Sequence, residues 1–203
     1  MKSKSVIGIL LAVCASLILC FAAPAMAAQD SPAGAVSSNL GDYNYAYDRW
    51  ANPINSYLVP NADGTLTRVE FTGETVVAET YDSQLNYISG IAIDAELPIF
   101  GGFHCGENYN FLVFGQSNPD EDDAVEVIRV VSYTKDWQRV GAASLLGGNT
   151  YIPFDAGSLR FAEYNGYLYI RTAHEMYLSD DGRHHQANLT LNVRISDMQI
   201  TDS

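Results

Sequence analysis

Short apolar runs cut by turn signals dominate this sequence from about Asn55 to Ser203. The turn segments are rich in Gly, Asn and Asp, and they read PNADGT, TGET, SNPDEDD, GGNT, YNGY and DDGR. Such residues supply the backbone conformations that reverse a chain. No stretch after residue 27 shows a convincing 3.6-residue apolar period. The pattern therefore predicts an all-β protein.

The apolar runs recur along the chain with residues of similar type at matching positions. Residues 76–88 align with residues 127–140 at an offset of 52, pairing Tyr81 with Tyr133 and Leu85 with Trp137. Residues 104–115 align with residues 160–171 at an offset of 56, and LTLNVRISDMQIT near the C-terminus resembles a further copy. Self-similarity at this period is typical of repeat architectures. We expect about three modules, each an apolar hairpin followed by a second hairpin.

Four-stranded modules of this length are typical of β-propeller blades. The run VEVIRVVSY favours burial on both faces, as expected for a sheet that lies between two neighbours. Three blades are fewer than the roughly four to eight of a closed ring, so the prediction is a partial or incomplete propeller. Open strand edges would then favour a homo-oligomer. A β-sandwich is the alternative, because it also buries alternating strands.

The N-terminus has the features of a secretory signal peptide. Lys2 and Lys4 precede an apolar run from Val6 to Ala23, and small residues flank Met26 in an A-x-A site. We expect cleavage after Ala27, with a retained membrane anchor as the alternative. Residues 28–54 form a leader segment, expected to be partly disordered at its start. Residues 55–203 form the repeat domain.

The stretch that begins EVIRVVSYTKDWQRV and ends NVRISDMQITDS resembles secreted or cell-surface repeat proteins of Gram-positive bacteria that look like β-propellers. The resemblance covers about residues 55–203. It implies an extracellular location and a propeller-like fold. That family has no assigned reaction, so the resemblance implies no catalytic residue.

The net charge of the chain restricts the kinds of partner that it can bind. The chain has 11 basic and 24 acidic residues, and loss of residues 1–27 leaves 9 basic residues and a net charge of −15. Such a charge repels nucleic acids and anionic membranes. Of three cysteines only Cys105 lies outside the signal peptide, which excludes an internal disulfide. We expect Cys105 to be a small core residue.

Three of the four histidines lie between residues 174 and 185, next to Glu175 and Asp181. His174, Glu175 and His185 are candidate catalytic residues. A two-residue turn at Asp181-Gly182 would place His174 opposite Leu189, roughly 13 Å from His185. A wider loop would bring them closer and permit a shared metal ion. The segment is also the best predicted binding loop, with the candidates His174, Asp181, His184, His185 and Asn188.

The acidic run at residues 120–123 is a weak candidate for Ca²⁺ or another divalent metal, through Asp120, Asp122 and Asp123. Otherwise no cofactor is expected. Glu107 and Glu163 occupy matched positions of two modules and are expected to be structural. The sequence favours a non-catalytic surface protein that presents loops to a polysaccharide or protein. The alternative is an extracellular hydrolase or lyase that uses the histidine segment.

Overall fold

The computed structural model describes residues 54–155 and 157–203, in which every regular element is a β-strand. The all-β prediction is confirmed. The predicted signal peptide and residues 28–53 of the predicted leader lie outside this range. Within it, no helix is long and apolar enough to span a membrane.

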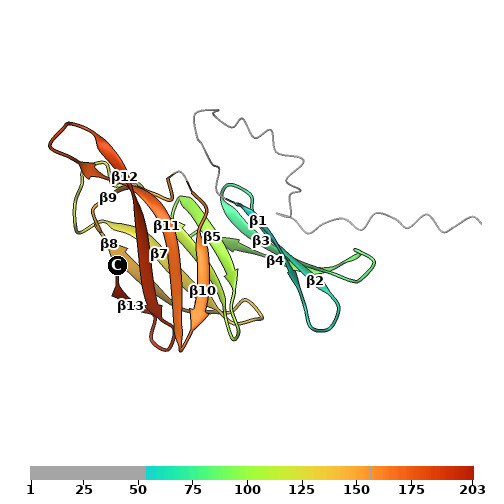
Figure 1. Cartoon of the computed structure of the whole chain (residues 1–203). Coiled ribbons are helices and arrows are strands. Elements are labelled where there is room, and N and C mark those ends of the chain that lie inside the picture. Colours follow the sequence, from blue (N-terminus) through green and yellow to red (C-terminus); the bar gives the residue numbers. More distant parts are fainter. Residues whose placement is uncertain (1–53, 156) are drawn as a thin grey trace, which may run out of the picture. The chain divides into compact units, whose positions relative to one another are not determined.

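The strands form three antiparallel sheets in which neighbours along the chain are neighbours in the sheet (Figure 1). Sheet A contains β1 (Ser56–Pro60), β2 (Leu66–Phe71), β3 (Thr75–Tyr81) and β4 (Tyr87–Asp94). Sheet B contains β5 (Ile99–Cys105), β6 (Asn110–Gly115), β7 (Glu126–Tyr133) and β8 (Arg139–Leu146). Sheet C contains β10 (Arg160–Tyr164), β11 (Tyr167–Leu178), β12 (His184–Arg194) and β13 (Gln199–Asp202), and β9 (Thr150–Pro153) pairs with β11.

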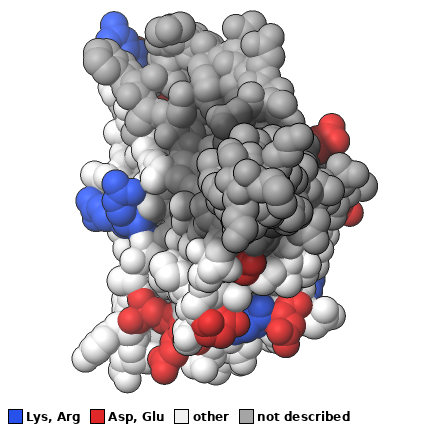
Figure 2. Space-filling model, turned by 90° about the vertical axis from the view of Figure 1, so that its right-hand side faces the viewer, with Lys and Arg blue, Asp and Glu red and all other residues white. Residues whose placement is uncertain are grey.

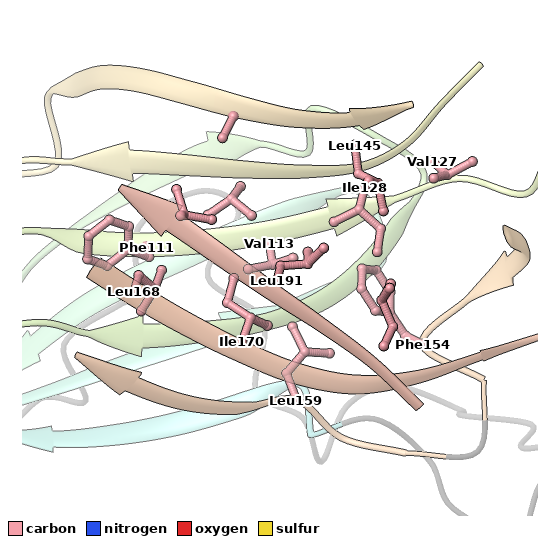
Figure 3. Packing of buried hydrophobic residues seen from close by; sticks show 14 of the residues in the cluster. Phe111, Val113, Val127, Ile128, Leu145, Phe154, Leu159, Leu168, Ile170 and Leu191 are labelled. Carbon is pink, nitrogen blue, oxygen red and sulfur yellow. The ribbon is translucent and has the colours of Figure 1, made fainter. Parts of the chain in front are cut away.

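Sheet B is buried on both faces. All six residues of β6 are buried, and its alternating side chains enter two different apolar clusters. Leu112 and Phe114 pack with Val69 and Val76 of sheet A. On the other side, Val113 packs with residues of sheet C, and Figure 3 shows Ile170 and Leu191 beside it. Sheet B is therefore the middle layer. Its inner strands β6 and β7 are mostly apolar because both of their faces are covered, whereas the edge strand β8 is partly exposed.

Phe154 joins sheet C to sheet B through a slot that only glycine leaves open. Its ring is 2% exposed. A Cβ atom on Gly101 or on Gly115 would lie 2.7 Å from that ring. Side chains at these two positions of β5 and β6 would therefore collide with it, so the Phe154 ring can pack directly against the backbone of sheet B.

Several hairpin turns share one hydrogen-bonding pattern. In the turns Asn61–Thr65, Asp82–Asn86, Thr134–Gln138 and Ser179–Arg183, the first N–H donates to the fifth carbonyl and the fourth N–H donates to the first carbonyl. The fourth residue has a positive φ, which suits Gly64 and Gly182. Leu85 and Trp137 have the same conformation, with φ of 64° and 63°. These are the two residues that the sequence alignment pairs.

This turn type changes the expected register of β11 and β12. A two-residue turn predicts His174 opposite Leu189, but His174 lies opposite Ala187, and Leu178 lies opposite His184. The two-residue prediction is wrong because Gly182 closes a longer turn and the pairing shifts between Glu175 and Leu178. The hairpin is long, with strands of 12 and 11 residues, and its register shifts near the tip.

Leu85 and Trp137 share a left-handed backbone conformation, but their side chains have different surroundings. Leu85 is 69% exposed, whereas Trp137 stacks on Phe103 with ring centroids 5.7 Å apart. We predict that Leu85→Gly raises the free energy of unfolding by about 1 kcal/mol, because glycine adopts positive φ without a Cβ penalty. Trp137→Gly should lower it by at least about 2 kcal/mol, because the lost packing outweighs the relief. Urea unfolding of both variants measures this, and destabilisation by Leu85→Gly would contradict the prediction.

Candidate functional site

A cavity of about 720 Å³ opens where the ends of sheets B and C meet. Its walls come from the β5–β6 turn, the β10–β11 turn and the β12–β13 turn. The second of these is the YNGY segment, in which Asn165 and Gly166 both have positive φ, as a two-residue hairpin turn requires. We call this space the end cavity.

Glu163 occupies the centre of one wall. It is the fourth residue of β10, on the side of sheet C that faces sheet B, and 19% of its side chain is exposed. Its Oε2 accepts a hydrogen bond of 3.0 Å from the backbone N–H of Glu107. A Cβ on Gly106 would lie 2.2 Å from the same oxygen, so a side chain at that position would displace the carboxylate. The β5–β6 turn therefore holds the Glu163 carboxylate in place.

His104 lies beside this carboxylate. Its imidazole is stacked between the rings of Phe161, at 5.3 Å, and Phe111, at 6.3 Å. The His104 Nε2 atom is buried and has no hydrogen-bond partner among the described residues. It lies 3.7 Å from Glu163 Oε2, which is too far for a hydrogen bond. Burial lowers the pKa of His104 despite the opposing effect of the carboxylate, so the imidazole is neutral at pH 7.

Cys105 follows His104 and is exposed, so the prediction that it is a core residue is wrong. It ends β5, where the strand leaves the buried layer. Its Sγ lies 3.3 Å from the Lys135 ammonium group. That ammonium also donates to backbone carbonyls of the β5–β6 turn, at Gly106 and Tyr109. Lys135 thus ties the β7–β8 turn to the turn that holds Glu163.

The rim of the end cavity is aromatic and polar. Tyr164 is 74% exposed, and Tyr167 and Asn165 line the cavity with it. Arg194 also lines the cavity and forms a two-pronged ion pair with Asp197, at 2.9 and 2.7 Å. A fixed carboxylate, amides and exposed tyrosine rings are groups that bind hydroxyl-rich ligands through hydrogen bonds and ring contacts.

The predicted histidine site is divided among separate partners at the other end of the β11–β12 hairpin. His174 is 5% exposed, and its Nδ1 lies 2.7 Å from Thr150 Oγ1. Burial lowers its pKa. His184 stacks on Tyr151 at 3.9 Å and contacts the Met176 carbonyl at 2.9 Å. These contacts satisfy each imidazole locally.

The remaining candidates of that segment are at the surface. His185 Nε2 lies 2.9 Å from Asp181 Oδ2, and both side chains are about half exposed. Glu175 lies opposite Gln186, and the exposed Asn188 lies opposite Ala173. The structure thus places the candidate residues along one hairpin. Their catalytic and binding roles remain predictions.

The acidic candidates form a capped loop beside the same hairpin tip. Asp122 Oδ1 accepts the Ala124 N–H at 2.8 Å, and the Tyr177 hydroxyl donates to Asp123 Oδ1 at 3.3 Å. Asp120 is exposed at the apex of the loop. Among residues 54–155 and 157–203, no three His, Cys, Asp or Glu side chains come together as a metal-binding group. A metal at Asp120, Asp122 and Asp123 therefore remains a prediction.

Sequence reasoning identified Glu107 and Glu163 as a matched pair but not their contact. The pair was expected to be structural, and the hydrogen bond between the Glu107 N–H and Glu163 agrees with a positioning role for the first residue. The sequence grouped His104 with His174 and His185, whose imidazoles an enzyme cleft would bring together, and did not group it with Glu163. One sequence feature could have identified His104: it is a polar residue that follows the buried residues of β5 and precedes Cys-Gly.

Two comparisons with known proteins found no match to this chain. No protein-family model matches the chain, and no curated protein matches it. Among solved structures, a crystal structure of the D477G ACO/RPE65 chimera is similar with a TM-score of 0.49 and 8% sequence identity. The match covers 74% of this chain and 37% of the chimera, so this chain spans well under two thirds of that protein. A likeness this weak supports no statement about function.

Neutral, buried His104 predicts a specific dependence of stability on pH. Its pKa is lower in the folded than in the unfolded chain, where it is about 6.5. The unfolded chain therefore binds the proton more readily, and stability falls as the pH decreases from about 6.5 toward the folded pKa. We predict that His104→Gln loses less stability than the wild type between pH 7.5 and 5.0.

Urea unfolding at several pH values measures this effect. His174 contributes with the same sign, so the variant should retain part of the slope. Gln84→Ala, at an exposed position of the β3–β4 turn, changes no titratable group and should follow the wild type. Equal slopes for His104→Gln and wild type would show that burial does not perturb the His104 imidazole.

Proposed function

We propose that this chain is a secreted or cell-surface, non-catalytic binding protein, and that the end cavity binds an extracellular polysaccharide. The observation on which the proposal depends is the Glu163 carboxylate, held by a backbone N–H at the base of a cavity with exposed tyrosine rings. The predicted signal peptide supports the extracellular location.

We also propose that the sheets are blades of a partial β-propeller. Each sheet has a chain path in which successive strands are neighbours, and sheet B is packed on both faces. The third and fourth strands of sheets A and B are joined by the same turn, with Leu85 and Trp137 in the left-handed conformation. These features support a propeller, in which blades stack face to face, over a two-layered sandwich.

A polysaccharide fits the end cavity better than a protein does. Sugar hydroxyls donate to a carboxylate, and the faces of sugar rings pack on tyrosine rings. Protein interfaces of ordinary stability need a contiguous surface of about 800 Å² on each partner, with an apolar centre. The exposed large apolar residues are instead dispersed over sheets A, B and C, for example at Leu58, Val140 and Leu178.

Retention of the protein on immobilised polysaccharides tests the proposal. We predict that Glu163→Gln and Tyr164→Ala each weaken binding of the retained polysaccharide about tenfold, which corresponds to about 1.4 kcal/mol. The first change removes the charged acceptor and the second removes an exposed ring. Affinity electrophoresis in gels that contain neutral or acidic polysaccharides measures both.

His185→Ala is the control, because it alters the hairpin tip at the other end of β11 and β12. Loss of binding in that variant alone would move the site to the predicted loop. The hydrolase or lyase alternative predicts release of new reducing ends from the same polysaccharides and their loss in His174→Ala. If the wild type binds none of the polysaccharides, the proposed function is wrong.

A further inference from the structure

Two arginines face each other across neighbouring strands of sheet C, and neither pairs with an acidic residue of the described chain. Arg160 of β10 is the register partner of Arg171 of β11, and both are exposed. Leu168 and Ile170 of β11 are buried in the cluster shared with sheet B. Side chains alternate along a strand, so Tyr167, Tyr169 and Arg171 lie on the opposite face. We call that the outer face of sheet C.

This pair opposes folding. Like charges directly opposite each other on a sheet are destabilising. In the described part of the chain, Arg68, Arg129, Arg139 and Arg194 form ion pairs with carboxylates, whereas Arg160, Arg171 and the turn residue Arg183 form none. Acidic residues are abundant in the chain, and Figure 2 shows them gathered along the lower edge of another face. An unneutralised arginine pair in such a protein indicates an external anion.

The residues around the pair would suit a sugar chain. On the other side of β11, Thr190 of β12 lies opposite Arg171. The next row toward the end cavity contains Ala162, Tyr169 and Asn192 and ends at Asp202 of β13. The row after that contains Tyr164, Tyr167 and Arg194, whose guanidinium group pairs with Asp197. Rows on one face are about 7 Å apart along the strands. The Tyr167 and Tyr169 rings lie 6.2 Å apart, so a ring platform leads from the arginine pair toward the cavity.

We propose that the outer face of sheet C binds an acidic polysaccharide, with Arg160 and Arg171 together contacting one carboxylate or sulfate group of the chain. Guanidinium groups pair with such oxyanions through two parallel hydrogen bonds. Tyr164, Tyr167 and Arg194 line the end cavity and belong to this face, so the chain would continue into the cavity. The inference rests on the proposed polysaccharide function and specifies its ligand class as anionic.

Nucleic acid is a poorer ligand for the same arginines. Its binding depends on neutralising several successive phosphates, and the high negative charge of this protein opposes that. Two arginines that are register partners, in rows with Thr, Asn and Tyr residues, fit a polymer that has sugar hydroxyls between widely spaced acidic groups.

Affinity measurements on the whole secreted chain test the inference. The probes are highly methyl-esterified polygalacturonate and sparsely sulfated dextran, in which the acidic groups are widely spaced, together with neutral dextran and single-stranded poly(dT). We predict that the wild type binds one of the two acidic polysaccharides at least tenfold more tightly than dextran, and that Arg171→Gln and Arg160→Gln abolish this preference. The two acidic polysaccharides distinguish carboxylate from sulfate. Arg183→Gln, an equal change of charge at the β11–β12 turn, should keep the preference.

Thermal unfolding supplies a second readout. Without polysaccharide, Arg171→Gln should melt at a higher temperature than the wild type, because the repulsion from Arg160 is removed. The preferred acidic polysaccharide should raise the melting temperature of the wild type by more than it raises that of Arg171→Gln. A merely structural role for Arg171 predicts the opposite order without polysaccharide.

Each other outcome has a distinct meaning. Polysaccharide binding without an acidic preference, or with a preference that Arg183→Gln reduces equally, overturns the arginine site and leaves the proposed function intact. Tight binding of poly(dT) would show that the arginines bind nucleic acid and not an acidic polysaccharide. Binding of no polysaccharide at all overturns the proposed function itself.

Discussion

Burial of sheet B on both faces is the constraint on which the rest of the structure depends. All of β6 is buried, and its side chains alternate between the cluster shared with sheet A and the cluster shared with sheet C. Cys105 is the single cysteine of the described residues, so no disulfide joins one sheet to another. Stability must therefore come from apolar surface that three stacked sheets remove from water. Phe154 shows how close this packing is, since two glycines are needed to admit its ring.

The stacking also creates the end cavity. Sheets B and C pack through apolar side chains along their strands, but the strands end at turns with polar residues. Where these turns meet, the last inward-facing positions of β10 and β5 carry Glu163 and His104 in place of apolar residues. The carboxylate is held by a backbone N–H and the imidazole by aromatic stacking. A polar site on a rigid apolar base is suited to binding, because little conformational freedom is lost when a ligand enters.

The outer face of sheet C has a different character from the stacked faces. It has tyrosines, amides and arginines in regular rows, and one row opposes two like charges. A sheet face that only had to remain soluble would have avoided that arrangement in a chain so rich in acids. The face and the end cavity share residues at the Tyr167 end of β11. A single long ligand could therefore contact both.

The sequence by itself determined the all-β class and the position of several turns. These properties depend on local chemistry: Gly and Asn at positive φ in YNGY, and apolar runs where both faces of a strand are buried. The sequence pattern also paired Leu85 with Trp137, which share one turn conformation. It misjudged the β11–β12 register, because a bulge and a longer turn shift pairing without changing composition.

Only the tertiary structure decided where chemistry could occur. The histidines that are close in the sequence are satisfied by separate partners along one hairpin, whereas Glu163 and His104, which are far apart in the sequence, meet at the junction of two sheets. The Arg160 and Arg171 pair likewise depends on strand register. Strand alternation can be read from local sequence, but contacts between sheets depend on how distant segments stack, and no local pattern records that.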